Sequence, residues 1–266
     1  MKGARATPRL VFGSSVSSGD RVLPEEVAVA LSFNGTTQAV MMATPADLED
    51  FGIGFALTEG IAGPQDVLSV EVEAVPRGRD VQVWLAPEAE ARLAARRRVM
   101  AGPVGCGLCG IDSIDQALRE VPMVAPSAFA MTPSQVLAAV AALPGEQRLH
   151  DATRAVHGAA FWNGRVLLAR EDVGRHNALD KLVGGMQRQG IASEGAVVLT
   201  SRVSTDMVQK VAMLGAPMIV AVSAPTVAAV ELAERAGITL VALAKGDRFE
   251  VFSHSDRLMT EDSHVG

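Results

Sequence analysis

The chain has 266 residues, of which 48% are hydrophobic and 4% aromatic, and its net charge is −6 at pH 7. That composition supplies a packed core for one large or two smaller domains and excludes wholesale disorder. The acidic balance and the few aromatic side chains argue against nucleic acid or a membrane surface as a partner.

The first hundred residues predict a small α+β unit preceded by a flexible N-terminal segment. Residues 1–21 are rich in Ser, Gly and Arg, which predicts a flexible N-terminus, and they lack the apolar stretch of a signal peptide. Two strands are then expected around an Asn34-Gly35 turn. A helix is predicted from Thr44, as N-cap, to Gly60, followed by two more strands and a basic helix.

The stretch "GPVGCGLCGID" holds the only two cysteines, Cys106 and Cys109, and a short amphipathic helix is predicted directly after it. The most apolar segment, residues 216–230, is interrupted by Ser223 and Pro225 and is too short to span a bilayer. We therefore expect a cytoplasmic protein. In the reducing cytosol a C-x-x-C pair is more often metal-binding or reactive than a structural disulfide.

The second half predicts an α/β domain. A Pro-rich stretch suggests a boundary near residue 125, which divides the chain into an N-terminal α+β domain at 22–125 and an α/β domain at 126–266. Thr132 and Gln135 are spaced for a capping box, and a second Asn-Gly hairpin follows. Apolar strands then alternate with helices, which is typical of a sheet covered on both faces.

A C-x-x-C pair can bind a metal, form a redox disulfide or carry a nucleophilic sulfur. Structural zinc needs four ligands, and there is no second C-x-x-C and no closely spaced histidine pair. A zinc deaminase needs H-x-E, but His157 is followed by Gly158 and Ala159. A dithiol redox site lacks the expected strand before the pair. A glycine-rich loop before a helix N-terminus favours a mobile thiolate, which permits a sulfur relay without requiring one.

Three polar motifs stand at strand ends, where α/β sheets place ligands. "REDVGRHNALD" offers Arg175 and Lys181 to phosphates and His176 as a further cofactor-binding residue, unless Asn177 caps the helix and Asp172 pairs with Arg175.

The other two motifs also have a simpler alternative. Ser204, in "SRVSTD", is expected either to hold a phosphate or to cap a helix. "AKGDR" is either an ordinary turn or a site where Lys245 and Arg248 meet phosphate and Asp247 reads guanine.

Four motifs together resemble the formate dehydrogenase accessory sulfurtransferases, the FdhD family. They are "TPADLEDFGIGFALTEGI", "GCGLCGIDSIDQAL", "REDVGRHNALDKLVG" and the run from "TSRVSTDMVQK" to "RFEVFS". The resemblance covers about Leu23 to Ser253, with the motifs in order. It implies that a cysteine desulfurase loads sulfur as a persulfide. The sulfur then passes to the bis(molybdopterin guanine dinucleotide) cofactor of molybdenum, or tungsten, before insertion into formate dehydrogenase.

The resemblance also implies residue roles and a fold. Cys106 matches the persulfide position and Cys109 the assisting one. The cofactor-binding segment matches Leu243, Ala244, Lys245, Gly246, Asp247 and Arg248. The second domain is expected to be a three-layer α/β/α, cytidine-deaminase-like unit without its zinc, and the protein a homodimer. Because third and fourth ligands for zinc are missing, no structural metal is expected. The alternative is a zinc-stabilised chaperone that binds the cofactor without transferring sulfur.

Overall fold

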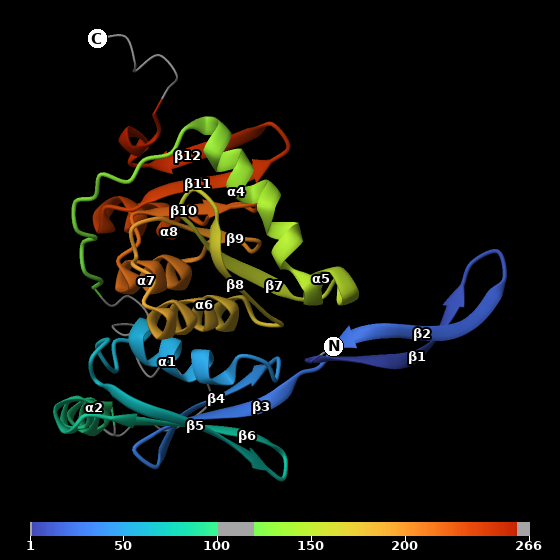
Figure 1. Cartoon of the computed structure of the whole chain (residues 1–266), viewed down its shortest axis with the longest axis horizontal. Coiled ribbons are helices and arrows are strands. Elements are labelled where there is room, and N and C mark those ends of the chain that lie inside the picture. Colours follow the sequence, from blue (N-terminus) through green and yellow to red (C-terminus); the bar gives the residue numbers. More distant parts are fainter. Residues whose placement is uncertain (1, 101–119, 260–266) are drawn as a thin grey trace.

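The computed structural model describes residues 2–100 and 120–259. Figure 1 shows two lobes and a projecting β-hairpin, which together make three sheets of two, four and six strands. We call residues 2–24 the N-terminal arm, residues 25–100 the N-terminal lobe and residues 120–259 the C-terminal lobe. The predicted mixed α/β class is confirmed, whereas the likeness to cytidine deaminases stays a prediction.

The N-terminal arm corrects the prediction for the first residues. Strands β1 (Ala4–Phe12) and β2 (Val16–Pro24) pair antiparallel along their full lengths, where the composition predicts an irregular segment. Composition does not show a register of cross-strand pairs, and it is this pairing that orders the arm. The base of the arm is closed by a hydrogen bond from the Glu25 N–H to the Gly3 carbonyl, 2.8 Å long.

The N-terminal lobe is a four-stranded sheet with helices on one face. Its strands lie in the order β4 (Thr36–Ala43), β3 (Val27–Phe33), β6 (Gly78–Leu85), β5 (Val67–Val75). Helices α1 (Leu48–Thr58) and α2 (Pro87–Met100) share one buried core with the inner face of this sheet. The predicted Asn34-Gly35 turn is confirmed, with positive φ at both residues.

Helix α1 begins later than predicted. Its N-cap is Asp47, in the left-handed conformation with a φ of 52°, and not Thr44. Thr44 is buried and bonds to the other lobe. Its N–H donates to Asp172 Oδ2 (3.0 Å), and its hydroxyl accepts from the Val173 N–H (3.2 Å). A tertiary partner thus replaces the local capping role.

The C-terminal lobe is a six-stranded mixed sheet with helices on both faces. The strand order is β12 (Arg248–Ser253), β11 (Thr239–Lys245), β10 (Met218–Ala221), β9 (Ala196–Leu199), β7 (His157–Trp162), β8 (Val166–Asp172). One face packs on α4 (Pro133–Glu146). The other packs on α6 (Arg175–Gln189), α7 (Thr205–Leu214) and α8 (Val227–Ala236).

The connections of this lobe follow local signals. Thr132 and Gln135 form the predicted capping box at the start of α4, and the short helix α5 (Arg148–Thr153) follows. The helix predicted directly after the cysteines falls mostly outside the described residues. The chain before α4 runs along the end of α8, where the Val124 N–H donates to the Ala236 carbonyl.

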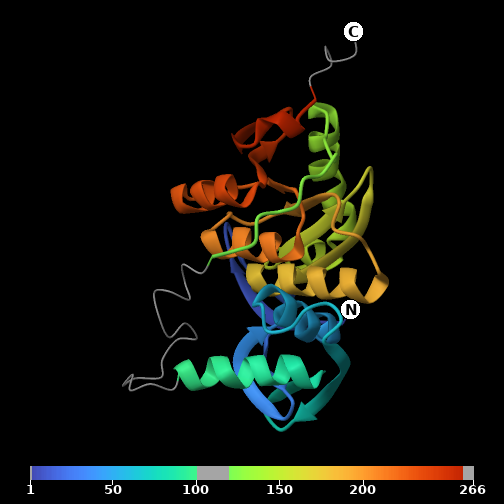
Figure 2. The same cartoon turned by 90° about the vertical axis from the view of Figure 1, so that its left-hand side faces the viewer.

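The two lobes meet where α1 crosses α6 (Figures 1 and 2). A Cβ on Gly54 would lie 1.7 Å from the Asp180 carbonyl oxygen, and one on Gly184 would lie 1.9 Å from that of Asp50. The helices therefore touch backbone to backbone. Two buried lysines, Lys181 and Lys210, lie over the rings of Phe51 and Phe55 from α1, at 5.8 and 5.6 Å.

Candidate functional site

Four strands of the C-terminal lobe end at the same edge of the sheet. Strands β9, β10 and β11 are parallel, and β8 runs the same way because both β8 and β9 pair antiparallel with β7. We call this edge the carboxyl edge. It comprises His157, where β7 begins, and the residues that follow the other strands: 172–176, 200–206, 223 and 243–248.

The start of α6 presents two basic side chains at this edge. Its N-cap is Gly174, so no side chain caps the helix. Arg175 Nε is buried and has no hydrogen-bond partner among the described residues. His176 Nε2 lies 3.6 Å from Asp206 Oδ2 of α7, and the contact with His176 lowers the pKa of Asp206. The free helix end, Arg175 and His176 suit an anion.

Asp172 does not pair with Arg175, as one interpretation of the motif predicted. Its carboxylate accepts from Lys181 Nζ (2.5 Å), the Gly174 N–H (2.8 Å) and Asn177 Nδ2 (3.0 Å). Lys181 is fully buried, and its Nζ also donates to the Thr44 carbonyl. The prediction that Lys181 meets phosphate is therefore wrong, and Asn177 is not the helix cap. The hydrogen bonds of Asp172 and Lys181 with Thr44 therefore join the two lobes.

His157 also belongs to the carboxyl edge, as the first residue of β7. Burial lowers the pKa of His157, and the nearby positive charge of Arg175 lowers it further, whereas Asp172 opposes both. The imidazole is therefore neutral at pH 7, and it can accept a proton or a hydrogen bond. His150 and His176 also act on His157 electrostatically. The three histidines belong to α5, β7 and α6 and come together only in the fold.

Ser204 is the N-cap residue of α7, but its side chain does not cap the helix. Its hydroxyl lies 3.4 Å from Asp206 Oδ2. By contrast, Thr226 at the start of α8 accepts from the Ala229 N–H. Ser201 is buried and its hydroxyl donates to the Arg202 carbonyl. Ser204, unlike Ser201, therefore shares Asp206 with His176 at the start of α7.

The predicted segment Leu243–Arg248 forms the turn between β11 and β12. Leu243 sits in a bulge with a φ of 53°, is 38% exposed, and donates its N–H to the Ser223 carbonyl. A positive φ at a leucine costs about 1–2 kcal/mol, and such strain is often found at ligand sites. Ala244 is buried under α4, so its side chain cannot meet a ligand.

The tip of this turn is exposed. Lys245 pairs with Arg248 across Gly246, which has a φ of 68°, and Asp247. All four are exposed. The geometry is that of a two-residue hairpin turn, and it also presents two cations and a carboxylate to solvent.

The predicted residues therefore fall into two groups along one edge. Arg175, His176 and Ser204 lie together at the starts of α6 and α7. Strands β8 and β11 are four steps apart in the sheet, which at about 4.8 Å per step is about 19 Å. Ser204 follows β9, which is only two steps, or about 10 Å, from β11, so the first group extends from the end of β8 toward the Leu243–Arg248 turn. The turn forms a second group, and the two groups together follow the carboxyl edge.

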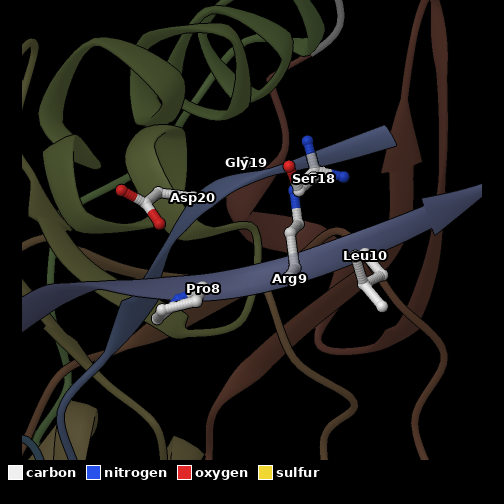
Figure 3. Close-up of a pocket in the computed structure, with 6 residues that line it drawn as sticks. All are labelled: Pro8, Arg9, Leu10, Ser18, Gly19 and Asp20. Carbon is white, nitrogen blue, oxygen red and sulfur yellow. The ribbon is translucent and has the colours of Figure 1, made fainter. Parts of the chain in front are cut away.

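Two hollows lie elsewhere on the surface. One of about 450 Å³ lies on the N-terminal arm (Figure 3). Another of about 170 Å³ is lined by Lys2, Arg148 and Arg170 together with acidic residues at the lobe junction. Neither includes a predicted site residue.

Among the residues that the structure describes, neither a metal site nor a membrane-spanning helix is found. Within residues 2–100 and 120–259, no three His, Cys, Asp or Glu side chains gather as a metal site would require. Cys106 and Cys109 lie outside those ranges, so their chemistry stays a prediction. In the same ranges, no helix has both the length and the apolar character needed to cross a bilayer.

Known proteins match this chain over nearly its full length, as the motifs do. The model of the FdhD/NarQ family matches residues 24–259. The chain belongs to the FdhD/NarQ family. The resemblance noted from the four motifs is thereby confirmed.

Several relatives in this family match over most of their length. Proteins named "Sulfur carrier protein FdhD" from Agrobacterium fabrum and Brucella abortus are 53% and 52% identical. The first match covers 91% of both chains, and the second covers 92% of this chain and 93% of the relative. The solved structure of a proposed formate dehydrogenase accessory protein from Desulfotalea psychrophila is 26% identical, with a TM-score of 0.75 over 96% of this chain and 99% of that one.

Proposed function

We propose that this chain is a sulfur carrier in formate dehydrogenase maturation, and that it carries the sulfur as a persulfide on Cys106. The observation that carries the proposal is the match, at about half identity and nearly full length, to proteins named as sulfur carriers. The chain has two cysteines, so the carrier sulfur is either Cys106 or Cys109. The cytosol is the compartment that suits free thiols.

The proposed chemistry is thiol exchange. The Cys106 thiolate attacks the outer sulfur of a persulfide on a cysteine desulfurase, forms a new S–S bond, and releases the desulfurase thiolate. Cys109 then attacks Cys106 Sγ, which releases hydrosulfide toward the molybdenum of the substrate and leaves a Cys106–Cys109 disulfide. A cytosolic dithiol reduces this disulfide for the next cycle.

The carboxyl edge is the proposed site for the substrate, the bis(molybdopterin guanine dinucleotide) cofactor. Its pyrophosphates need cations and N–H donors, which Lys245 and Arg248 supply at one end and Arg175, His176 and Ser204 at the other. Asp247 is suited to accept from the N1–H and N2–H₂ groups of guanine. Because the two groups together extend along the edge from the end of β8 to the end of β11, about 19 Å, they suit an elongated dinucleotide better than a single phosphate.

The proposal also includes the layering of the C-terminal lobe and two further partners. Helices on both faces of the six-stranded sheet support the cytidine-deaminase-like layering. The other proposed partners are formate dehydrogenase and a second copy of the chain.

Cys106→Ala is expected to abolish sulfur loading. Intact mass spectrometry after incubation with a cysteine desulfurase and cysteine should show one added sulfur atom on the parent and none on the variant. Cys109→Ala is the matched control and should keep the adduct, because it removes the releasing thiol and not the accepting one. An adduct retained on Cys106→Ala would move the role to Cys109. About one zinc per chain, lost with Cys109→Ser, would support the chaperone alternative.

Lys245→Ala combined with Arg248→Ala is expected to weaken binding of GDP, a fragment of the cofactor. Each charge-assisted hydrogen bond is worth roughly 1.5–3 kcal/mol, so loss of one weakens binding about ten- to a hundredfold in calorimetry. GDP should also bind better than ADP. Arg165→Ala is the control, because Arg165 is an exposed cation in the β7–β8 turn at the opposite edge of the sheet. Equal GDP affinity in both variants would place the guanine site elsewhere.

A further inference from the structure

The side chain of His157 lies on the face of the six-stranded sheet that α6 covers. Residues paired directly across two antiparallel strands point to the same face, and His157 pairs with Asp172 in this way. Asp172 accepts a hydrogen bond from Lys181 of α6, so the shared face is the α6 face. Gly158, the next residue of β7, faces the other way, because a Cβ there would meet the side chain of Gln147 before α5.

Charged and titratable groups from three other elements act on His157. Arg175 and His176 open α6, Asp172 ends β8, and His150 belongs to α5. These residues come from both sides of the strand pair β7–β8. His157 therefore stands among groups whose charges decide whether its own imidazole can hold a proton.

Two of the charges near His157 already have partners. Lys181 pairs with Asp172, and both side chains are fully buried. His176 Nε2 lies 3.6 Å from Asp206 Oδ2 of α7. Arg175 differs from them, because among the described residues it forms no ion pair and its buried Nε has no hydrogen-bond partner.

The unpaired charge of Arg175 is one that a bound anion would offset. In the free chain, burial lowers the pKa of His157 and Arg175 lowers it further, while Asp172 acts in the opposite direction. An anion on Arg175 cancels the unfavourable charge and attracts a proton to the imidazole, so it raises the pKa of His157. Cover by the ligand adds little desolvation, because His157 is already partly buried.

We propose that His157 takes up a proton from solvent when the carboxyl edge binds its anionic substrate, so that His157 and Arg175 together match the two charges of a pyrophosphate. The inference rests on the proposed function, which places the pyrophosphates of the cofactor at this edge. A pyrophosphate esterified at both ends carries one negative charge on each phosphorus. His157 is then a specificity-determining residue that favours such a dianion over an anion of single charge.

Binding should therefore become tighter as the pH falls. In the free chain His157 loses its proton below its ordinary pKa, and in the complex it keeps the proton to a higher pH. Between these two pKa values, binding takes up a proton and the affinity rises by up to about tenfold for each pH unit. Outside that interval, His157 exchanges no proton and the affinity no longer changes through it.

The probe for this coupling is diguanosine pyrophosphate, in which two guanosines are joined through a pyrophosphate esterified at both ends. Its two charges stay constant across the range in which histidine titrates. GDP is unsuitable here, because a terminal phosphate itself titrates near pH ~6 and would add its own pH dependence.

Histidine ring NMR of the parent protein, with and without saturating probe, tests the proposal directly. The chain has five histidines, so a spectrum of His157→Gln assigns the His157 resonance. The pKa of His157 should lie below its ordinary value in the free protein and rise when the probe binds. Calorimetry should show the affinity of the parent for the probe rising about fivefold or more from pH 7.5 to pH 6, with net proton uptake in buffers of different ionisation enthalpy.

Two variants locate the proton. His157→Gln should abolish the proton uptake and flatten the pH dependence of binding. His254→Gln is the matched control and should behave like the parent, because His254 follows β12 at the opposite edge of the sheet.

Three outcomes would overturn the proposal. A pKa of His157 that stays constant or falls on binding removes the coupling. Proton uptake that persists in His157→Gln and disappears in His176→Gln assigns the coupling to His176. In both cases the proposed function stands if binding still depends on Lys245 and Arg248. No binding of the probe at any pH would instead overturn the proposed cofactor site, and this inference with it.

Discussion

Gly54→Ala should lower the free energy of unfolding by about 3 kcal/mol or more, or prevent folding altogether. The new Cβ would lie 1.7 Å from the Asp180 carbonyl oxygen and 2.9 Å from the Gly184 backbone nitrogen. Neither atom belongs to a flexible side chain, so α1 and α6 must move apart. That movement opens the lobe interface along its length. Urea denaturation measures the loss.

Gly145→Ala is the matched control for Gly54→Ala. Gly145 also lies in a helix, α4, but nothing lies within 4 Å of the position its Cβ would take. Alanine is favoured over glycine in a helix by roughly 0.5–1 kcal/mol, so this variant should be as stable as the parent or more so. Equal losses in the two variants would show that helix propensity, and not the backbone contact, dominates.

Lys210→Met should lower the free energy of unfolding by about 3–5 kcal/mol, because it leaves a buried carboxylate without its cation. Lys210 Nζ lies 2.8 Å from Asp180 Oδ1 and 2.7 Å from Glu59 Oε1, and Asp180 is fully buried. Burial alone would lower the pKa of Lys210, but the two carboxylates raise it above its ordinary value. The lysine is therefore charged and tightly held.

A second substitution tests whether the buried charge is the cause. Asp180→Asn added to Lys210→Met should recover much of the loss, since no carboxylate then lies buried at position 180. Lys245→Met removes an exposed cation at a hairpin tip and should change stability by about 0.5 kcal/mol at most. If Lys210→Met proved as mild as Lys245→Met, the ion pair would contribute little to holding the lobes together.

Local signals predicted the local structure well. The capping box of Thr132 and Gln135 and the Asn34-Gly35 turn depend only on neighbouring residues, and both are present. Thr44 carries an equally good capping signal, but its partner is Asp172, 128 residues away. The arm was missed for a related reason, because strand pairing depends on register and not on composition.

The candidate site was predicted in part for similar physical reasons. Arg175, His176 and Ser204 each follow a strand, and parallel strands bring such positions to one edge. Lys181 lies six residues after Arg175, nearly two helical turns further on, and faces the lobe junction, which the motif could not show. His157 is the first residue of its strand, so it reaches the edge only because β7 runs opposite to β9.

The crossing of α1 and α6 makes the two lobes behave as complementary fragments. The contact between Gly54 and Gly184, with the buried lysines beside it, joins residues far apart in the chain and does not depend on the connection through residues 101–119. A protease cut within that connection would therefore yield two polypeptides that stay associated.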